Sequence, residues 1–487
     1  MLQNIFRLSL LALACGLPLL AGAEDAQDTP AAQPVNSSQD PDLEGMPAPS
    51  GDPDLEGMPG PSGETTGTTS VASPRQASGP TASFRGRFRT QANLDLASNR
   101  PGEDLVESQS SFELEAALSV SPNFSARLSG RLLLDVRSPE RDFGGAARAF
   151  FDSELRDAVI TLNRGRASLE IGQQVLRWGS TEINSPNDII NPLDLRRGPG
   201  VDFEGPVLPI PLVRAAYAGD RAGGELVYVP FFFPTRGYAF GSDWTPLLAA
   251  PQLLGLLQQQ AQVTKARGAE EALFATNAPS FMPRNGSVGG RAFLRGDGWD
   301  ARLNLFYGWD RIPEILLTQP ALTSTFYRDL GIGVDGSAVL DDFVFRIDAR
   351  FSTKRTFYTE QLIPFRTRAL SWAGGVEFRE RFLLELYGVW LPARTAEDAP
   401  LLFIDRHQAN AAFMYRETFL RDRLKVNVGL QYGLVRKDWV ISGLAGYEVH
   451  PGHDVEAGVL VLEGKGLSVG GLFDTNDYAF VRYTYGF

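Results

Sequence analysis

The chain has 487 residues, with 46 Lys and Arg against 58 Asp and Glu, so its formal net charge is −12. It contains 50 Gly, 31 Phe and a single Cys, a composition that favours β structure over helix. One Cys excludes a disulfide scaffold, and the negative charge argues against a nucleic-acid-binding protein. The only long apolar run is N-terminal, which excludes a helical membrane protein.

Residues 1–23 have the pattern of a secretory signal peptide. Arg7 precedes an apolar stretch that ends in an Ala-Gly-Ala cleavage site, so Glu24 is the expected first residue of the mature chain. A lipoprotein signal would instead be cut before Cys15 and would leave an apolar segment on the mature protein. With the signal removed the chain has no thiol, which rules out cysteine catalysis and thiolate metal sites.

Residues 24–82 form a segment rich in Pro, Gly, Ser, Thr and acidic residues. Because it cannot bury enough apolar surface to offset chain entropy, we expect a disordered acidic tail. The tail holds a tandem repeat, DPDLEGMPAPSG followed by DPDLEGMPGPSG, at residues 40–63. The repeat is either a spacer that arose by duplication or a doubled linear motif that would strengthen binding of a periplasmic protein.

Residues 83–487 alternate apolar and polar side chains along many segments. The stretch 84–96 is one example, and the period of two recurs at 124–137, 343–352 and 423–435. Successive side chains of a strand point to opposite faces, so each stretch predicts a strand with one apolar and one charged face. The strands are about ten residues long, as a tilted membrane crossing requires, and aromatics lie near the ends of the apolar face.

The chain ends in YAFVRYTYGF, an alternating strand whose aromatic face includes Tyr483, Tyr485 and the terminal Phe487. This ending resembles the C-terminal strand through which bacterial outer-membrane barrels are recognised for insertion, which implies the barrel-assembly machinery as a partner. Lipid offers no hydrogen bonds to an open sheet edge, so a β-protein in a membrane must close on itself. We therefore predict an all-β, transmembrane antiparallel barrel surrounded by outer-membrane lipid, with a secreted soluble β-protein as the alternative.

Eighteen strands are predicted, or 16 if the strands that bound the longest loop are miscounted. They begin near residues 83, 111, 123, 154, 166, 212, 223, 286, 299, 330, 342, 369, 381, 407, 422, 438, 453 and 477. Connections after even strands are short and those after odd strands mostly long, apart from 436–438, which matches short periplasmic turns and long extracellular loops. An even strand count places both termini, and the acidic tail, in the periplasm.

The charged faces of these strands would line the lumen. The predicted lumen-lining cations are Arg85, Arg87, Arg89, Arg127, Arg131, Arg346, Arg350, Lys425 and Arg482. They predict a wet lumen that is mildly basic at the first strand, which favours anionic or amphiphilic solutes. Alternatively, the cations and acids simply pair with each other and line the interior in a purely structural role.

Two predicted outer loops are too long to be simple connections. The first, 178–211, is rich in Asn, Asp and Pro, and we expect a fixed, self-packed loop that either folds into the lumen or paves the rim. The second contains 246–275, where leucines at helical spacing predict one or two short helices. An apolar helix face there would either pack over the lumen as a plug or contact lipid as a lid at the rim.

The first loop lies in a run, 172–217, that is similar to a signature of an uncharacterised, porin-like family of proteobacterial outer-membrane barrels. In that signature a strand ends in Arg-x-Trp-Gly, and an Asn- and Asp-rich loop then leads into Asn-Pro-x-Asp and a Pro-rich return. The matching positions include Arg177, Trp178, Gly179, Asn191, Pro192 and Asp194. The resemblance implies a porin-like barrel, and some members are encoded with exporters of the resistance-nodulation-division type. The tail at 24–82 is not part of the pattern.

Catalytic and metal-binding interpretations are not favoured. His450 and His453 flank a Pro-Gly pair that already explains a turn, and two imidazoles are too few for a metal site. His407 with Asp405 is the only candidate pair at an outer strand edge, and no serine pattern accompanies it. We therefore expect neither an enzyme nor a cofactor.

The leading functional hypothesis is a channel in the outer membrane of a Gram-negative cell. It would pass small polar, anionic or amphiphilic solutes through a lumen that the two long loops restrict. The alternative is a non-conducting platform whose periplasmic tail recruits a protein complex. An energised importer is disfavoured, because the tail carries no segment that reads as a folded plug domain.

Overall fold

The computed structural model describes residues 79–96, 105–137, 148–196, 207–237, 244, 249, 277–318, 321–392 and 400–487. The chain divides into two units, Met1–Glu64 and Thr65–Phe487, and every described residue belongs to the second. The expected signal peptide, the repeat at 40–63 and, apart from residue 249, the expected helices at 246–275 lie outside the described residues.

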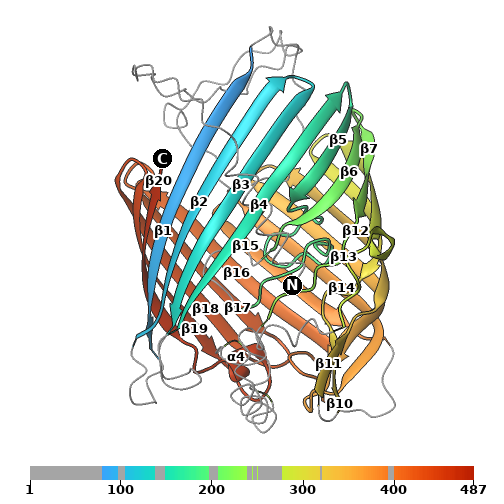
Figure 1. Cartoon of the computed structure of the whole chain (residues 1–487). Coiled ribbons are helices and arrows are strands. Elements are labelled where there is room, and N and C mark those ends of the chain that lie inside the picture. The colour runs from blue at the N-terminus through green and yellow to red at the C-terminus, as the bar shows by residue number, and fades with distance from the viewer. Residues whose placement is uncertain are drawn as a thin grey trace. The chain divides into compact units, whose positions relative to one another are not determined.

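The described strands of the second unit form one antiparallel sheet that closes into a barrel of 18 strands (Figure 1). These strands are β1 (Thr81–Asp95), β2 (Leu105–Ser121), β3 (Phe124–Arg137), β4 (Arg148–Arg164), β5 (Ala167–Gln174), β6 (Ile210–Ala218), β7 (Ala222–Val229), β8 (Ser287–Gly296), β9 (Trp299–Trp309), β12 (Arg328–Leu340), β13 (Phe343–Tyr358), β14 (Pro364–Phe378), β15 (Phe382–Trp390), β16 (His407–Phe419), β17 (Leu424–Gly433), β18 (Trp439–His450), β19 (His453–Glu463) and β20 (Tyr478–Gly486). Because β1 pairs with both β2 and β20, neither the first nor the last strand is left as an open edge.

The predicted 18-stranded barrel is confirmed, and the alternative of 16 strands is wrong. Three strands begin earlier than expected: β2 at 105, β4 at 148 and β14 at 364, instead of near 111, 154 and 369. Their first residues still pair with a neighbouring strand, as Leu105 does with Leu94 and Pro364 with Tyr358. A ladder of backbone hydrogen bonds can continue where the alternation of side chains has stopped.

The two ends of the barrel differ in their connections. Those that follow β2, β4, β6, β8, β12, β14, β16 and β18 are short, and their end is called the short-turn end below. The opposite, long-loop end carries a hairpin that the sequence did not predict, β10 (Glu314–Thr318) with β11 (Ala321–Thr325), and two short helices, η4 (Pro283–Asn285) and α4 (Val469–Leu472). Besides 434–438, the connection 359–363 is also short at this end.

The outward faces of the strands form an apolar band. Large apolar side chains recur there at every second position and are widely exposed, among them Leu128, Leu132, Leu303, Leu305, Ile347, Leu384, Leu386 and Val481. Between them lie inward residues that are buried; Ile347 is 63% exposed, for example, whereas the next residue, Asp348, is 2% exposed. A water-soluble protein rarely exposes so extensive an apolar surface, so this is the face that lipid covers.

Aromatic rings border the band at both ends. At the short-turn end Phe343, Phe378, Phe382 and Tyr415 form a row in which successive ring centroids are 4.8, 6.4 and 5.1 Å apart. At the long-loop end Tyr432 lies 4.1 Å from Trp439, and Trp390 stacks on His407 at 6.3 Å. Such belts lie at the two membrane–water interfaces of transmembrane barrels. The closed sheet and the belted apolar band make this chain a transmembrane β-barrel of the outer-membrane type.

The expected insertion signal ends the closing strand. The Tyr483 hydroxyl is 2.7 Å from Nδ1 of His453, Tyr485 stacks on the same imidazole at 4.5 Å, and Phe487 stacks on Tyr485 at 5.5 Å. Phe487 and Gly86 on β1 exchange two backbone hydrogen bonds of 2.8 and 3.0 Å. The C-terminal residue therefore completes the seam between the first and last strands. No helix among the described residues is long and apolar enough to cross a membrane.

Candidate functional site: the lumen and its internal loop

One side of the barrel wall is low, and a long loop enters the lumen there. β5, β6 and β7 have only 8, 9 and 8 residues, whereas β1 to β4 have 15, 17, 14 and 17. After Gln174 the chain leaves the wall as the internal loop, defined here as residues 175–196. Of the two expected placements, lumen or rim, the structure shows the lumen, because the loop binds inward-facing side chains of β12, β13 and β15.

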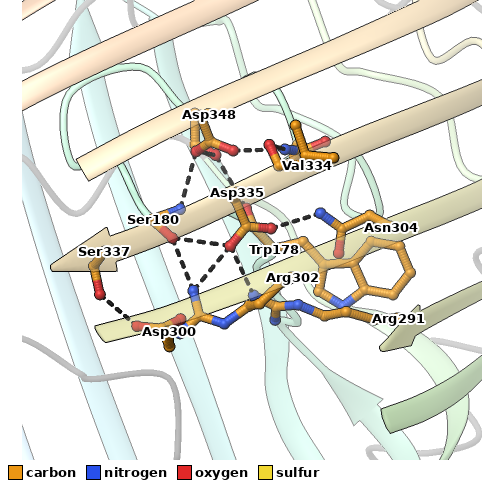
Figure 2. Close-up of polar contacts among 12 residues, drawn as sticks. Trp178, Ser180, Arg291, Asp300, Arg302, Asn304, Val334, Asp335, Ser337 and Asp348 are labelled. Atoms are coloured by element: carbon orange, nitrogen blue, oxygen red, sulfur yellow. Dashed lines mark hydrogen bonds and ion pairs between the residues drawn. The ribbon is translucent and has the colours of Figure 1, made fainter. Parts of the chain in front are cut away.

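The first anchor of the internal loop is Asp348 on β13 (Figure 2). Its carboxylate accepts hydrogen bonds from the backbone amides of Ser180 and Thr181 at 2.9 and 3.2 Å. It also accepts from the hydroxyls of Thr181 and Ser185 at 2.9 and 2.7 Å, and from the Asn187 amide at 2.5 Å. Hydrogen bonds to a charged acceptor are stronger than neutral ones, so this cluster fixes one turn of the loop to the wall.

The second anchor is Asp335 on β12, whose side chain is fully buried. It accepts from the Ser180 hydroxyl at 2.9 Å, so it shares the same loop residue with the first anchor (Figure 2). Arg302 and Arg291 donate to it at 2.8 and 3.2 Å, and the Asn304 amide at 2.6 Å. Two guanidinium groups offset the cost of burying this charge.

The third anchor is Glu385 on β15. Three successive backbone amides of the loop, those of Glu182, Ile183 and Asn184, donate to its carboxylate at 3.1, 3.2 and 2.7 Å. Consecutive N–H groups that converge in this way form an anion-binding concavity. Here the anion belongs to the barrel itself, so the loop tip is bound to the wall opposite its point of entry.

The side chain of Glu182 adds two ion pairs beside the third anchor. Its carboxylate lies 3.2 Å from Arg346 on β13 and 2.8 Å from Arg416 on β16. Through the three anchors and Glu182, the loop is attached to four strands, β12, β13, β15 and β16. All four contacts lie on one side of the lumen, near the short-turn end.

Trp178 and Gly179 of the signature set the shape of the loop at its entry. Trp178 is 2% exposed, donates to Glu225 through Nε1 at 2.5 Å and meets the Phe306 ring edge-on at 6.3 Å. Gly179 has φ +108°, and a Cβ there would lie 1.7 Å from the Ser185 hydroxyl. Only glycine accommodates both the backbone conformation and this close approach.

Asn191 and Pro192 hold the return of the loop. The Asn191 amide oxygen accepts from the Leu176 backbone at 2.9 Å, and its nitrogen donates to the carbonyls of Gln174 and Leu208 at 3.3 and 2.8 Å. The Pro192 carbonyl accepts from the Leu208 amide at 2.8 Å. Asn191 therefore acts as a buried cross-link between the two ends of the loop.

Two other charged residues of the signature lie in ion pairs. Asp194 binds Arg196 at 2.6 Å, and Arg196 reaches Asp152 on β4 at 2.9 Å. Arg177 lies 3.9 Å from Asp188 of the same loop. Burial raises the pKa of Asp188 to about 7; Arg177 acts against this rise, and the negative charge of Asp348 adds to it.

Most of the predicted lumen cations are paired. The paired cations and a carboxylate partner of each are Arg87 with Glu113, Arg127 with Asp157, Arg131 with Glu154, Arg346 with Glu377, Arg350 with Asp329, and Arg482 with Glu456. Arg89 also has an interaction partner. Within the described part of the chain, Arg85 and Lys425 have no ion-pair partner. The expected basic character is therefore largely cancelled by pairing.

A cavity of about 390 Å³ lies beside β1 to β5. It lies at the short-turn end, beside the start of β1, the end of β2 and the start of β3. Small side chains make up much of its wall, namely Ser83, Ala117, Ser119, Ser125 and Thr161. Arg127 and Glu170 are the charged residues in its lining.

An apolar cluster lies inside the mouth at the long-loop end. It contains Leu460, Leu462, Phe473 and Phe480, and Trp244 and Phe403 pack against it. The Phe473 ring is 5.3 Å from that of Trp244 and 6.2 Å from that of Phe403, so three different connections meet here. This mouth cluster narrows the lumen above β18 to β20.

The residues set aside as catalytic or metal-binding candidates are not brought together. Asp405 binds Arg436 at 3.1 Å, whereas His407 stacks on Trp390. The imidazoles of His450 and His453 are 6.4 Å apart. Among the described residues, no group of three or more His, Cys, Asp or Glu could hold a metal ion.

The alternation at 343–352 placed Asp348 on a charged face, but the sequence did not predict that Asp335, Asp348 and Glu385 anchor the loop or that Arg416 contacts it. The available signal was an acid in the middle of an inward strand face, where a charge needs a partner. The alternation shows which face of a strand points inward, but it does not show which group binds the acid there.

Residues 79–221 match the sequence model of a family described as "Protein of unknown function (DUF1302)". Comparison with the curated proteins gave no match. Among solved structures, the chain is similar to OccAB4 of Acinetobacter baumannii, with 10% identity over 85% of this chain and 99% of that one and a TM-score of 0.47. It is also similar to two proteins of Pseudomonas aeruginosa. The outer membrane protein opdK is 12% identical over 84% of this chain and 99% of that one, with a TM-score of 0.45. OccK11 (OpdR) is 12% identical over 84% of this chain and 95% of that one, with a TM-score of 0.43.

Proposed function

We propose that the protein is an outer-membrane channel for small polar, anionic or amphiphilic solutes, with the internal loop as a fixed constriction. The observation that carries the proposal is the attachment of this loop to Asp335, Asp348 and Glu385 on one side of a polar lumen. A loop attached in this way narrows the lumen. The cavity beside β1 to β5 remains available as part of a path.

Several features support a path for hydrated solutes along that side. Small hydroxyl and methyl side chains line the cavity at the short-turn end, which leaves space beside the wall. Paired charges offer both donors and acceptors to a passing solute without trapping it. Arg85 and Lys425, both near the short-turn end, would attract anions there, which supports the anionic part of the proposal.

The proposed orientation follows from the lengths of the connections. Transmembrane barrels carry short turns on the periplasmic side and long loops on the outside. With this orientation the start of β1 and the end of β20 face the periplasm, and so would the acidic tail. Solutes entering from outside would pass the mouth cluster first and the internal loop second.

The test is a conductance measurement in planar bilayers on the full-length mature protein. The variant replaces residues 180–190 by a short Gly-Ser linker, which removes all contacts with the three anchors. We expect discrete conductance steps for both proteins, and larger ones for the variant. As a matched control, the same linker replaces residues 316–323 in the outer hairpin, which should leave the step size unchanged. An absence of conductance from both the wild-type protein and the loop variant would refute the channel.

A second candidate function is a non-conducting platform whose periplasmic tail recruits a protein complex through residues 40–63. The mouth cluster favours it, because six apolar side chains from β19, β20 and three connections fill part of the lumen. This function predicts that a periplasmic protein is captured by the wild-type protein and lost on deletion of 40–63. It also predicts that the loop variant stays closed.

A further inference from the structure

Three arginines lie on the outward face of β12 and β14 at the long-loop end. Arg328 has the same orientation on β12 as Ile332, which is exposed on the apolar band. Arg366 and Arg368 have the same orientation on β14 as Phe378, whose ring belongs to the outward-facing aromatic row at the short-turn end. Arg328, Arg366 and Arg368 are called the arginine patch below.

The strand register places the patch at one height. Gly331 on β12 pairs with Ser352 on β13, and Ser352 pairs with Ala369 on β14. Arg328 lies three residues from Gly331 toward the long-loop end of β12. On β14, Arg368 and Arg366 lie one and three residues from Ala369 toward the same end. Only β13 separates the two strands (Figure 1). The backbones that carry the arginines of β12 and β14 are therefore about 10 Å apart across the wall.

Aromatic rings hold two of these guanidinium groups at the level of the membrane interface. The Arg328 guanidinium lies 4.6 Å from the Trp309 ring and 5.2 Å from the Tyr307 ring, and Tyr307 is 46% exposed on the outer face. That of Arg366 lies 3.5 Å from the Tyr327 ring. Aromatic residues at the end of an apolar band sit among lipid headgroups, so the stacked arginines do as well.

The patch keeps donors that the protein does not use. Arg366 has one carboxylate partner, Glu314 at 3.2 Å, and Arg328 donates to the Gly286 carbonyl at 3.0 Å. Arg368 is exposed and has no ion-pair or hydrogen-bond partner among the residues that the structure describes. The three arginines and one acid leave a net positive surface at headgroup height.

The short-turn end provides a contrast. Arg379 lies over the Phe378 ring at 5.1 Å, which is the same kind of stacking, but it is ion-paired with Asp342 at 2.9 Å. The carboxylate neutralises this arginine. Arg379 is therefore compensated by an acid, whereas Arg328 has no carboxylate partner among the described residues.

We propose that the arginine patch binds the phosphate groups of a bis-phosphorylated glycolipid in the outer leaflet. The planar guanidinium fork matches phosphate geometry, and two phosphates on one headgroup can bridge arginines whose backbones are about 10 Å apart. The inference rests on the proposed orientation, in which the long-loop end meets the outer leaflet. It does not depend on conductance, because the patch lies outside the lumen.

The test is a lipid titration of the detergent-solubilised protein, followed by native mass spectrometry. The probe is a bis-phosphorylated, acylated glucosamine disaccharide, compared with the same lipid after phosphatase treatment and with phosphatidylglycerol. We expect the triple variant Arg328→Gln, Arg366→Gln, Arg368→Gln to bind the probe at least about tenfold more weakly, and Arg368→Gln alone about threefold more weakly. The matched control Arg379→Gln should bind like the wild-type protein.

Three results would overturn the proposal: unchanged affinity in the triple variant, equal binding of the phosphatase-treated lipid, or tighter binding of phosphatidylglycerol than of the probe. Resistance to unfolding in cold detergent shows that each variant is folded. If the triple variant is not folded, Arg368→Gln decides the question, because Arg368 is exposed and has no ion pair or hydrogen bond within the described part of the chain that the substitution would break. Bilayer conductance of the same variants separates this proposal from the channel, since conductance can fail while the lipid still binds.

Discussion

At the scale of single residues, three buried carboxylates determine where the internal loop lies. Asp335 has two arginine partners, whereas Asp348 and Glu385 accept mainly from amides and hydroxyls of the loop. Without these donors their charges would face a low-dielectric wall at considerable cost. The buried acids of the wall and the donors of the loop therefore stabilise each other. A substitution in either should shift or loosen the loop.

Substituting Asp348→Asn should loosen the loop and leave the barrel folded. The amide keeps the shape of the carboxylate but turns one acceptor into a donor, which would face the donors of Ser180, Thr181 and Ser185. We expect the seated loop to lose about 2–4 kcal/mol of stability. Proteolysis within 180–190 on intact barrels measures this, with Asp341→Asn as the control. Asp341 lies in a short turn at φ +50°, which Asn tolerates, so its variant should be cleaved like the wild-type protein.

Asp188 should make loop movement depend on pH. Its pKa is about 7 in the seated loop, because burial disfavours the charged form, and its ordinary value is 3.8. The seated state therefore binds the proton more tightly, so its advantage is greatest at low pH and is lost as the pH rises through about 7. Single-channel recordings should show more current fluctuations at about pH 8 than at about pH 5. Asp188→Asn should remove most of this difference; an equally steep change in that variant would mean that another group is responsible.

At the scale of elements, strands were predictable and the placement of the loop was not. A strand shows its own period of two, so each of the 18 could be located from local sequence. The hairpin of β10 and β11 escaped prediction because it stands at the long-loop end, where side chains need not alternate between lipid and lumen. The anchors of the loop lie far along the chain, since Ser180 and Asp348 are separated by 168 residues and Asn184 and Glu385 by 201. Local pattern carries no information about such pairs.

The closing strand β20 gives a prediction at the same scale. Deleting Phe487 removes two backbone hydrogen bonds to Gly86 and the stacking on Tyr485. We expect less folded protein in the outer-membrane fraction, because the first and last strands lose the end of their seam. Quantifying folded and unfolded protein by heat-dependent migration measures the effect. Phe487→Tyr is the control, since it preserves both backbone bonds and the ring, and normal yields of the deletion variant would show that the seam tolerates a frayed end.

At the scale of the whole described barrel, the filling of the lumen is asymmetric. The low wall of β5 to β7 admits the internal loop, which crosses to β12, β13, β15 and β16, while the mouth cluster occupies the side of β18 to β20. The wall of β1 to β5 faces the remaining cavity. The ion pairs of β1 to β4, such as Arg127 with Asp157, lie on the same side as this cavity, so a solute there would meet both donors and acceptors.

Closure of that cylinder can be tested directly through its first and last strands. Ala92 on β1 pairs with Val481 on β20, and the sequence contains no cysteine besides Cys15, so paired cysteines can be introduced without interference. The pair Ala92→Cys with Val481→Cys should oxidise to a disulfide, because directly opposite Cβ atoms lie about 4.5–5.5 Å apart. The denatured product would be circular over most of its length and should migrate differently until it is reduced. Ala92→Cys with Ala479→Cys is the matched control: its Cβ atoms are about 7–8 Å apart, too far for a disulfide. Equal cross-linking of both pairs would mean that the seam slips in register, and cross-linking of neither would mean that the first and last strands do not meet.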